Sequence, residues 1–181
     1  IEPDPYDPAQ ARRLLAEAGF ARGFEGGEFT IAPPYEGAGE VIANYMAAVG
    51  IRMKIRTMER AAFFSSWREG KLKGVVFGGL GPAGNAATRL QILAVKGSPY
   101  AAGVMPEVQD LFERQARELD RRKREELLHQ IQKLLHDRTV FAPIWENGFI
   151  RGVGPRVEEP ALALIPFYPY AAPYEDLRLK P

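Results

Sequence analysis

The sequence predicts an α/β fold, on the strength of three observations. Residues 51–57 alternate apolar and basic side chains, which is typical of a half-buried strand. A segment with helical apolar spacing precedes this strand, and a short strand-like run at residues 28–32 precedes that segment. Strand, helix and strand in this order form a βαβ unit with parallel strands. The chain has 181 residues, 46% of them hydrophobic, so it can bury the core of one globular domain.

The first helix is predicted by its two ends. Asp7 can accept a hydrogen bond from the first turn, Pro8 suits the first helical position, and Gln10 completes a capping box. Gly19 supplies the left-handed residue that commonly ends a helix. The apolar side chains between these ends share one helical face: Ala11, Leu14, Leu15 and Ala18.

The βαβ unit follows a glycine-rich turn expected around Gly26 and Gly27. Its first strand, residues 28–32, is interrupted by two consecutive prolines. Its helix ends at Gly50, and its apolar residues recur at helical spacing: Val41, Ile42, Tyr45, Met46 and Val49. The second strand, residues 51–57, follows at once.

A further helix and strand complete the first half of the chain. Residues 61–69 predict a short helix that ends at Gly70, and residues 74–77 are an apolar run typical of a covered parallel strand. The helix carries three aromatic residues whose spacing is most simply explained by core packing, with ligand contact as the alternative: Phe63, Phe64 and Trp67.

The second half begins with a long segment, residues 78–105, that lacks periodicity apart from a helical stretch at residues 87–95. Loops of this length in compact domains are usually functional. Two helices follow, one over residues 106–118 and one capped by Asp120.

The last predicted element is a strand at residues 140–145, after which the chain is rich in proline and tyrosine. We expect an α/β lobe over residues 1–159 and an irregular tail over residues 160–181. Prolines forbid a regular helix in that tail, and with its aromatic side chains they make a stiff apolar ribbon that must pack on another part of the protein.

Charge and composition exclude several classes of function. A net charge of +1 leaves no electrostatic footprint for nucleic acid or an anionic membrane. The absence of cysteine excludes thiolate zinc sites, iron–sulfur clusters and cysteine nucleophiles. His129 and His136 are seven residues apart, whereas helical metal ligands prefer three or four, so both are interpreted as surface residues. Ser65 and Ser66 lack a nucleophile-elbow pattern, so we expect no catalytic residue, no metal and no cofactor.

The glycine-rich segment from residue 78 onward is the strongest site candidate. It matches neither the dinucleotide fingerprint nor the phosphate-binding loop, because no Lys-Ser or Lys-Thr pair follows it. It does follow a strand, and open α/β sheets bind ligands at the carboxyl ends of their strands. The candidate ligand-binding residues are Tyr35, which follows the two prolines, and four positions after residues 74–77: Gly78, Gly79, Asn85 and Arg89.

Two segments stand out by their sequence: residues 6–20, YDPAQARRLLAEAGF, and residues 49–55, VGIRMKI. They are followed along the chain by residues 67–70, WREG, the helix after Asp120, and the proline-containing residues 141–145, FAPIW. In this order the segments resemble the C-terminal lobe of family 5 (oligopeptide, dipeptide and nickel type) ABC-transporter solute-binding proteins. Residues 6–20 resemble the helix that opens that lobe, and residues 49–55 are similar to its strand-entry segment.

The resemblance implies one lobe of a two-lobed, periplasmic-binding-protein-like fold, with a small mixed sheet flanked by helices and the N-terminal lobe absent. It further implies that a peptide or similar small solute binds between lobes that close by a hinge and is passed to ABC permease subunits in the membrane. It implies too that the tail at residues 160–181 returns towards the absent lobe, so the isolated lobe should self-associate weakly through the tail or the cleft face. The whole protein would be periplasmic or an extracellular lipid-anchored protein. A standalone protein-interaction domain and an α/β enzyme are the alternatives.

One departure from the family bears on the cargo. By the resemblance, dipeptide binders carry an acidic residue in the loop that matches residues 78–89, where it pairs with the amino group of the ligand. This chain has no Asp or Glu there, so we expect no amine clamp from the segment. Its first charged residue is Arg89, which is either a partner for a carboxylate of the cargo or an ordinary exposed or structural arginine.

Overall fold

The computed structural model describes residues 1–2, 4–79, 85–98, 100–102, 104–146, 150, 152–161 and 174–181. The chain divides into two compact units, Ile1–Leu80 and Gly81–Pro181. Each unit has its own secondary structure and its own buried residues, and each is described by itself.

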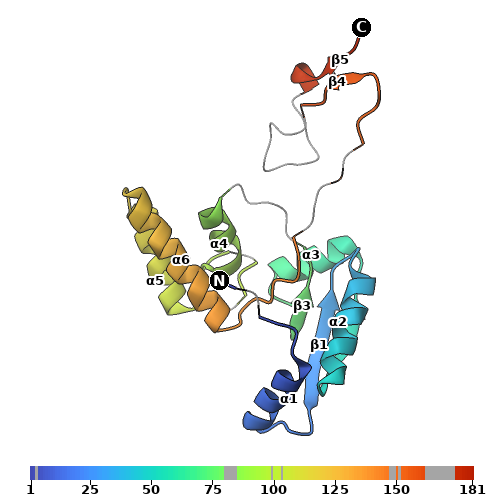
Figure 1. Cartoon of the computed structure of the whole chain (residues 1–181), viewed down its shortest axis with the longest axis vertical. Coiled ribbons are helices and arrows are strands. Elements are labelled where there is room, and N and C mark those ends of the chain that lie inside the picture. The colour runs from blue at the N-terminus through green and yellow to red at the C-terminus, as the bar shows by residue number, and fades with distance from the viewer. Residues whose placement is uncertain are drawn as a thin grey trace. The chain divides into compact units, whose positions relative to one another are not determined.

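The first unit is built on a three-stranded sheet, of which Figure 1 labels β1 and β3. Its elements are α1 (Pro8–Glu17), β1 (Phe24–Ile31), α2 (Glu36–Ala48), β2 (Ile51–Thr57), α3 (Arg60–Arg68) and β3 (Val75–Phe77). The strand order is β2-β1-β3, and both pairings are parallel. The α/β prediction is confirmed, with the detail that this sheet is entirely parallel rather than mixed.

Both ends of α1 agree with the sequence prediction. The Asp7 carboxylate accepts a hydrogen bond of 2.8 Å from the backbone N–H of Gln10, and Pro8 is the first helical residue. Gly19 has a φ of +88°, as its predicted role in ending the helix requires. The predicted apolar face is not buried, however, and Leu14 is 52% exposed.

The turn predicted at Gly26 and Gly27 is wrong, because β1 runs through both residues. The register with β2 shifts between Glu25 and Gly27, so Gly26 is the extra residue of a β-bulge. A Cβ at Gly26 would lie 3.0 Å from Ile51 Cγ2, and Gly27 has a φ of +79°. The glycines therefore permit a bulge inside the strand instead of a chain reversal before it.

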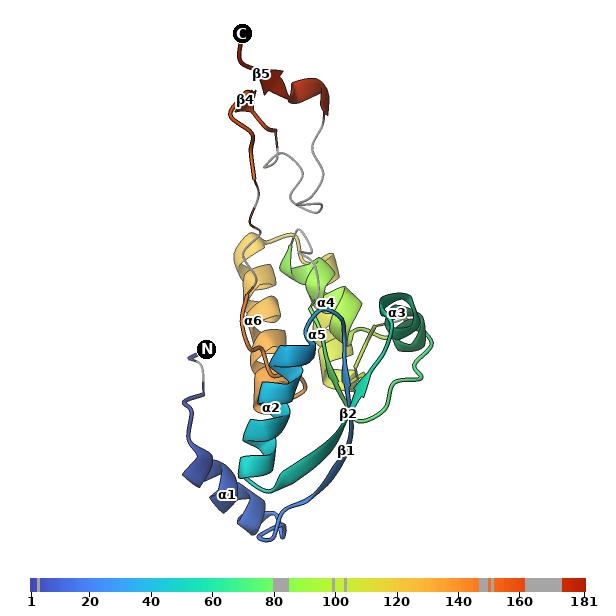
Figure 2. The same cartoon turned by 90° about the vertical axis from the view of Figure 1, so that its right-hand side faces the viewer.

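Helices α2 and α3 lie on opposite faces of the sheet (Figure 2). Ile31 points to α2, where a Cβ at Gly39 would overlap its Cδ1 atom. The next residue, Ala32, points the other way and shares its side of the sheet with Phe63 of α3, because successive strand residues alternate faces. Phe63 is fully buried and makes edge contacts with Phe64 and Trp67, so the core interpretation of this residue is confirmed.

The two outer strands differ, because β2 forms ion pairs with β1 whereas β3 exposes an apolar residue. Arg52 pairs with Glu25 at 2.6 Å and Arg56 with Glu28 at 3.2 Å, across the β1–β2 pair. Strand β3 has only three residues, and Val75 is 45% exposed. The expectation of a covered strand at residues 74–77 is therefore wrong for Val75, which lies at the sheet edge, where β3 pairs with β1 and with no other strand of the described residues.

The second unit has a helical core. Its helices are α4 (Ala86–Ala94), α5 (Pro106–Arg117) and α6 (Arg121–Asp137), all three close to the predicted segments. The Asp120 carboxylate caps α6 by accepting from the Lys123 N–H at 3.0 Å. The buried residues that hold the three helices together are Ala94, Val108, Ile131 and Leu135.

The strand predicted at residues 140–145 is wrong: the structure is irregular over residues 141–146. Val140 and Phe141 pack against the helical core, and Pro143 has no N–H to contribute to a ladder. In the described part of the chain no other strand lies against this segment, so its apolar composition alone does not make it one.

The C-terminal region contains a short antiparallel pair that the sequence did not predict. Strand β4 (Val157–Glu159) pairs with β5 (Arg178–Leu179), which follows the single-turn helix η1 (Tyr174–Asp176). The expectation of an irregular tail over residues 160–181 is thus incorrect at its end. Residues 162–173, with most of the predicted aromatic ribbon, lie outside the described residues, and the proposed boundary at residue 159 stays a prediction.

None of the helices in the described residues is both long enough and apolar enough to cross a membrane.

Candidate functional site

The candidate site in the first unit lies where β1 and β3 end. The ladder between these strands extends one step beyond them, since the Ala32 N–H donates to the Phe77 carbonyl at 2.8 Å. The chain then leaves β1 through a cis Pro33–Pro34 bond and leaves β3 through Gly78 and Gly79. Both exits lie at the carboxyl edge of a parallel sheet, where α/β folds bind their ligands.

Tyr35 is held at this edge by its backbone and its ring. Its N–H donates to the Ala32 carbonyl at 2.9 Å, which closes a tight turn, and its own carbonyl accepts from the Gly39 N–H, which begins α2. The ring is half-buried and lies 5.9 Å from the ring of Phe77. The predicted position of Tyr35, at a rigid turn after the strand, is confirmed.

Gly78 and Gly79 allow the two exits to approach each other. A Cβ at Gly78 would lie 2.9 Å from the Cβ of Ala32, and a Cβ at Gly79 would lie 2.5 Å from the Tyr35 hydroxyl oxygen. Any larger side chain at Gly79 would displace the tyrosine ring. Tyr35, Gly78 and Gly79 therefore form one surface, as expected from the sequence; whether it contacts ligand stays a prediction.

A charged residue that the sequence interpretation missed, Arg60, lies at the same edge. It is the first residue of α3, three positions after β2 ends. Its Nη1 donates to the Pro33 carbonyl at 3.4 Å, next to the turn that holds Tyr35, and its guanidinium lies 5.2 Å from the centre of the Phe64 ring. The signal in the sequence was its place directly after a parallel strand, the same rule that singled out residues 78 and 79.

The Glu59 carboxylate, beside Arg60, binds backbone N–H groups at the start of α3. Its carboxylate accepts hydrogen bonds from the N–H groups of Ala61 at 2.8 Å and Ala62 at 3.1 Å. These two bonds lower the pKa of Glu59 below its usual value, because they favour the ionised form. The carboxylate thus stabilises the N-terminus of α3 rather than facing a ligand.

The other two predicted site residues belong to the second unit. The Asn85 side chain caps α4 by accepting from the Thr88 N–H at 2.9 Å, which gives this residue a structural role. Arg89 lies in the first half of α4 and is half-buried. Their contact with ligand stays a prediction, as does any role for residues 80–84, which lie outside the described residues.

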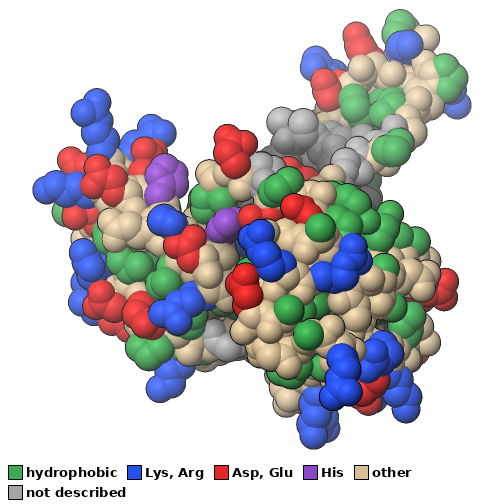
Figure 3. All heavy atoms as spheres, turned by 60° about the horizontal axis from the view of Figure 1, so that its bottom comes forward, with side chains coloured by type: hydrophobic (Ala, Val, Ile, Leu, Met, Phe, Trp, Pro, Cys, Tyr) green, Lys and Arg blue, Asp and Glu red, His purple; other side chains and the backbone are tan. Residues whose placement is uncertain are grey.

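Charged side chains elsewhere in the second unit form ordinary surface pairs. Figure 3 shows acidic and basic groups interspersed over α5 and α6. An open hollow of about 290 Å³ between these helices is lined by Arg114, Arg117, Glu118 and Leu127. Its charged groups already have partners, since Arg114 pairs with Asp110, Arg117 with Glu113, and the Glu118 carboxylate accepts from the Asp120 N–H. The hollow therefore offers a ligand few charged groups that are not already engaged within the protein.

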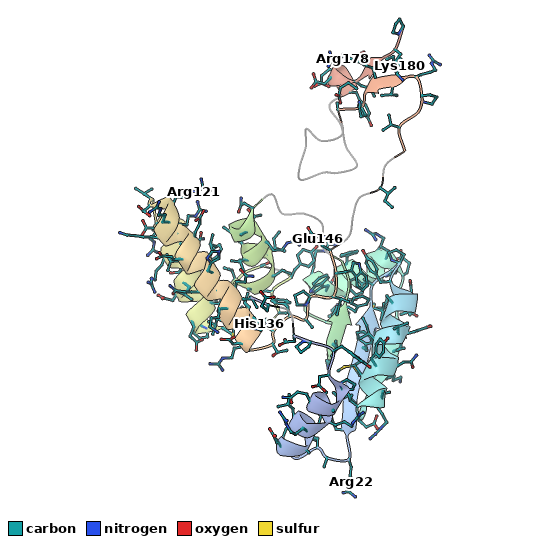
Figure 4. All side chains as sticks on the ribbon, viewed as in Figure 1. Arg22, Arg121, His136, Glu146, Arg178 and Lys180 are labelled. Carbon is teal, nitrogen blue, oxygen red and sulfur yellow. The ribbon has the colours of Figure 1, made fainter. Side chains whose placement is uncertain are left out.

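In the described ranges, no three His, Asp or Glu side chains come together in a way that could hold a metal ion. His129 is exposed, as expected. His136, near the C-terminal end of α6 in Figure 4, is half-buried. Its Nδ1 atom lies 3.6 Å from the Asp137 Oδ1 atom.

Comparison with known proteins now identifies the fold. Residues 1–101 match the bacterial extracellular solute-binding proteins, family 5, over the middle part of that family. The chain belongs to this family. The expected relationship to family 5 is therefore confirmed, and this is a family of solute-binding proteins rather than of enzymes.

Comparisons with individual proteins support the family match. The chain is 31% identical to di/tripeptide-binding protein 1 of Pseudomonas aeruginosa, over 80% of this chain and 29% of that protein. It is 28% identical to heme-binding protein A of Haemophilus influenzae, over 87% of this chain and 31% of that protein. The structure of the periplasmic binding protein DppA from Helicobacter pylori, in complex with the peptide STSA, superposes with a TM-score of 0.68 at 25% identity and covers 77% of this chain. The chain thus spans about three tenths of the length of these family 5 proteins.

Proposed function

We propose that this chain is the C-terminal lobe of the solute-binding component of an ABC importer. In this proposal a peptide or peptide-sized solute binds between this lobe and an N-terminal lobe, and the closed protein delivers it to permease subunits in the membrane. The observation that carries the proposal is the family 5 match over residues 1–101. The periplasm, or the outer face of the membrane with a lipid anchor, is the corresponding location.

The arrangement of the first unit supports this role. Tyr35, Gly78 and Gly79 form a rigid surface at the carboxyl edge of the sheet. An aromatic ring and exposed backbone suit a peptide, because the ring packs on apolar groups while N–H and C=O groups pair with the peptide backbone.

Haem is the second candidate cargo. The observation that favours it is the 28% identity to a heme-binding protein over 87% of this chain. A haem ring would use the same aromatic surface, and its two propionates would need donors at the rim.

The test is isothermal titration calorimetry on a protein of the relatives' full length that contains these 181 residues. The ligands are Ala-Ala, Ala-Ala-Ala, Ala-Phe-Ala and haemin. We expect saturable, one-to-one binding of at least one peptide. Saturable binding of haemin alone would transfer the proposal to haem, and no saturable binding of any ligand would contradict it.

A further inference from the structure

Arg60 at the start of α3 differs from the two arginines of β2, because it has no acidic partner among the described residues. Arg52 and Arg56 each form an ion pair with a glutamate of β1. Arg60 makes one long hydrogen bond to a carbonyl and one ring contact, and it pairs with no carboxylate in the described part of the chain. Because guanidinium has five N–H donors, most of its donors are still available.

The surroundings of Arg60 do not neutralise it. Glu59 is bound to the helix N–H groups of α3. Glu36 is the other acidic residue that follows a strand at this edge, and it lies in the first turn of α2, where the positive end of the helix offsets its charge. Residues 78–89 after β3 contain no Asp or Glu before Arg89.

The position of Arg60 is also fixed. The exposed guanidinium is held over the Phe64 ring while Nη1 reaches the Pro33 carbonyl, so the side chain bridges α3 and the turn that precedes Tyr35. Stacking on one face of the planar group leaves its edges available for hydrogen bonds, and two parallel N–H donors on one edge match the two oxygens of a carboxylate.

We propose that Arg60 binds a carboxylate of the cargo and thereby makes the site selective for anionic solutes. This inference rests on the proposed function, since it assigns a role within the same site. A peptide C-terminus and a haem propionate both supply the carboxylate, and the experiment separates these two sources.

The experiment uses the same full-length protein and compares acids with matched neutral ligands by calorimetry. The probes are Ala-Ala-Ala and its C-terminal amide, Ala-Phe-Ala and its C-terminal amide, and haemin and haemin dimethyl ester. The variants are Arg60→Gln, Arg60→Lys and Arg89→Gln, with Arg22→Gln as the control. Arg22 lies in the turn before β1, at the opposite end of that strand from the site (Figure 4).

The wild-type protein should bind the free acid of its preferred probe at least about tenfold more tightly than the neutral form, as a charge-assisted hydrogen bond implies. Arg60→Gln should abolish this preference by weakening only the acid, and Arg60→Lys should restore part of it, because lysine keeps the charge but loses the planar fork. Arg22→Gln should keep the full preference. An unchanged thermal midpoint shows that each variant is folded.

Three results would overturn the inference while leaving the proposed function intact. They are equal binding of acid and neutral forms by the wild type, equal weakening of both forms by Arg60→Gln, and loss of the preference in Arg89→Gln but not in Arg60→Gln. Absence of binding by every probe would instead overturn the proposed function, and the assignment of Arg60 with it.

Discussion

Gly79 and Tyr35 show how a single missing side chain shapes the surface at the end of β1. The tyrosine ring occupies the space that a Cβ at Gly79 would need. Because the ring is only half-buried, it has room to swing outward if that space is filled. The pair therefore couples a backbone position to the orientation of a candidate ligand-binding ring.

We predict that Gly79→Ala lowers cargo affinity by about tenfold, or about 1.4 kcal/mol, because the ring must rotate away from its position. The free energy of unfolding should change by less than about 1 kcal/mol, since the displaced ring is near the surface. Calorimetry and chemical denaturation on the full-length protein measure the two quantities. The control is Gly152→Ala, where nothing lies within 4 Å of the added methyl group. Equal affinities for both variants would remove Tyr35 from the site.

At this scale the sequence predicts part of the candidate site. Tyr35, Gly78 and Gly79 were placed at strand exits by local rules, and parallel pairing of β1 and β3 brings them together. Arg60 was missed because an arginine at the start of a helix resembles any solvated charge until its contacts are known. The Asn85 side chain caps α4, a role typical of asparagine before an α-helix, and its predicted contact with ligand stays a prediction.

Helix α2 packs on β1 through a glycine. Ile31 is fully buried, and its side chain fills the place where a side chain at Gly39 would be. Gly37, two residues earlier in the same helix, faces open space. Substituting each glycine by alanine therefore compares the cost of overpacking with the gain in helix propensity within one helix.

We predict that Gly39→Ala destabilises the protein by about 1–3 kcal/mol, because overpacking pushes the helix off the sheet and outweighs the gain in helix propensity. Gly37→Ala should be neutral or slightly stabilising. Urea denaturation followed by circular dichroism gives both free energies. Equal effects of the two substitutions would show that α2 does not pack on Ile31 as described.

The sequence predicts helix ends correctly where local signals determine them. Caps at Asp7 and Asp120 and the left-handed Gly19 set helix ends because their hydrogen bonds or dihedral angles are local. The strand expected at residues 140–145 failed because a strand needs a neighbour, which a local pattern does not supply. The turn expected at Gly26 and Gly27 failed for the same reason, since the bulge found there exists only in the register with β2.

The described part of the chain exposes several large apolar side chains. Helix α1 buries none of its residues, and large side chains beside it and on α2 are exposed, including Tyr6 at 78% and Tyr45 at 57%. The relatives are about three times as long as this chain. These features fit the proposal that these 181 residues act as one lobe of a larger binding protein.

Titration of one cargo into the 181-residue chain and into the full-length protein tests this central claim most directly. A single lobe covers one side of a ligand and leaves the other in water, so it loses much of the burial that a closed site provides. We predict that calorimetry gives an affinity at least about a hundredfold higher for the full-length protein, a difference of about 2.7 kcal/mol. Comparable affinities would contradict the account, because they would show that the 181 residues form a complete binding domain by themselves.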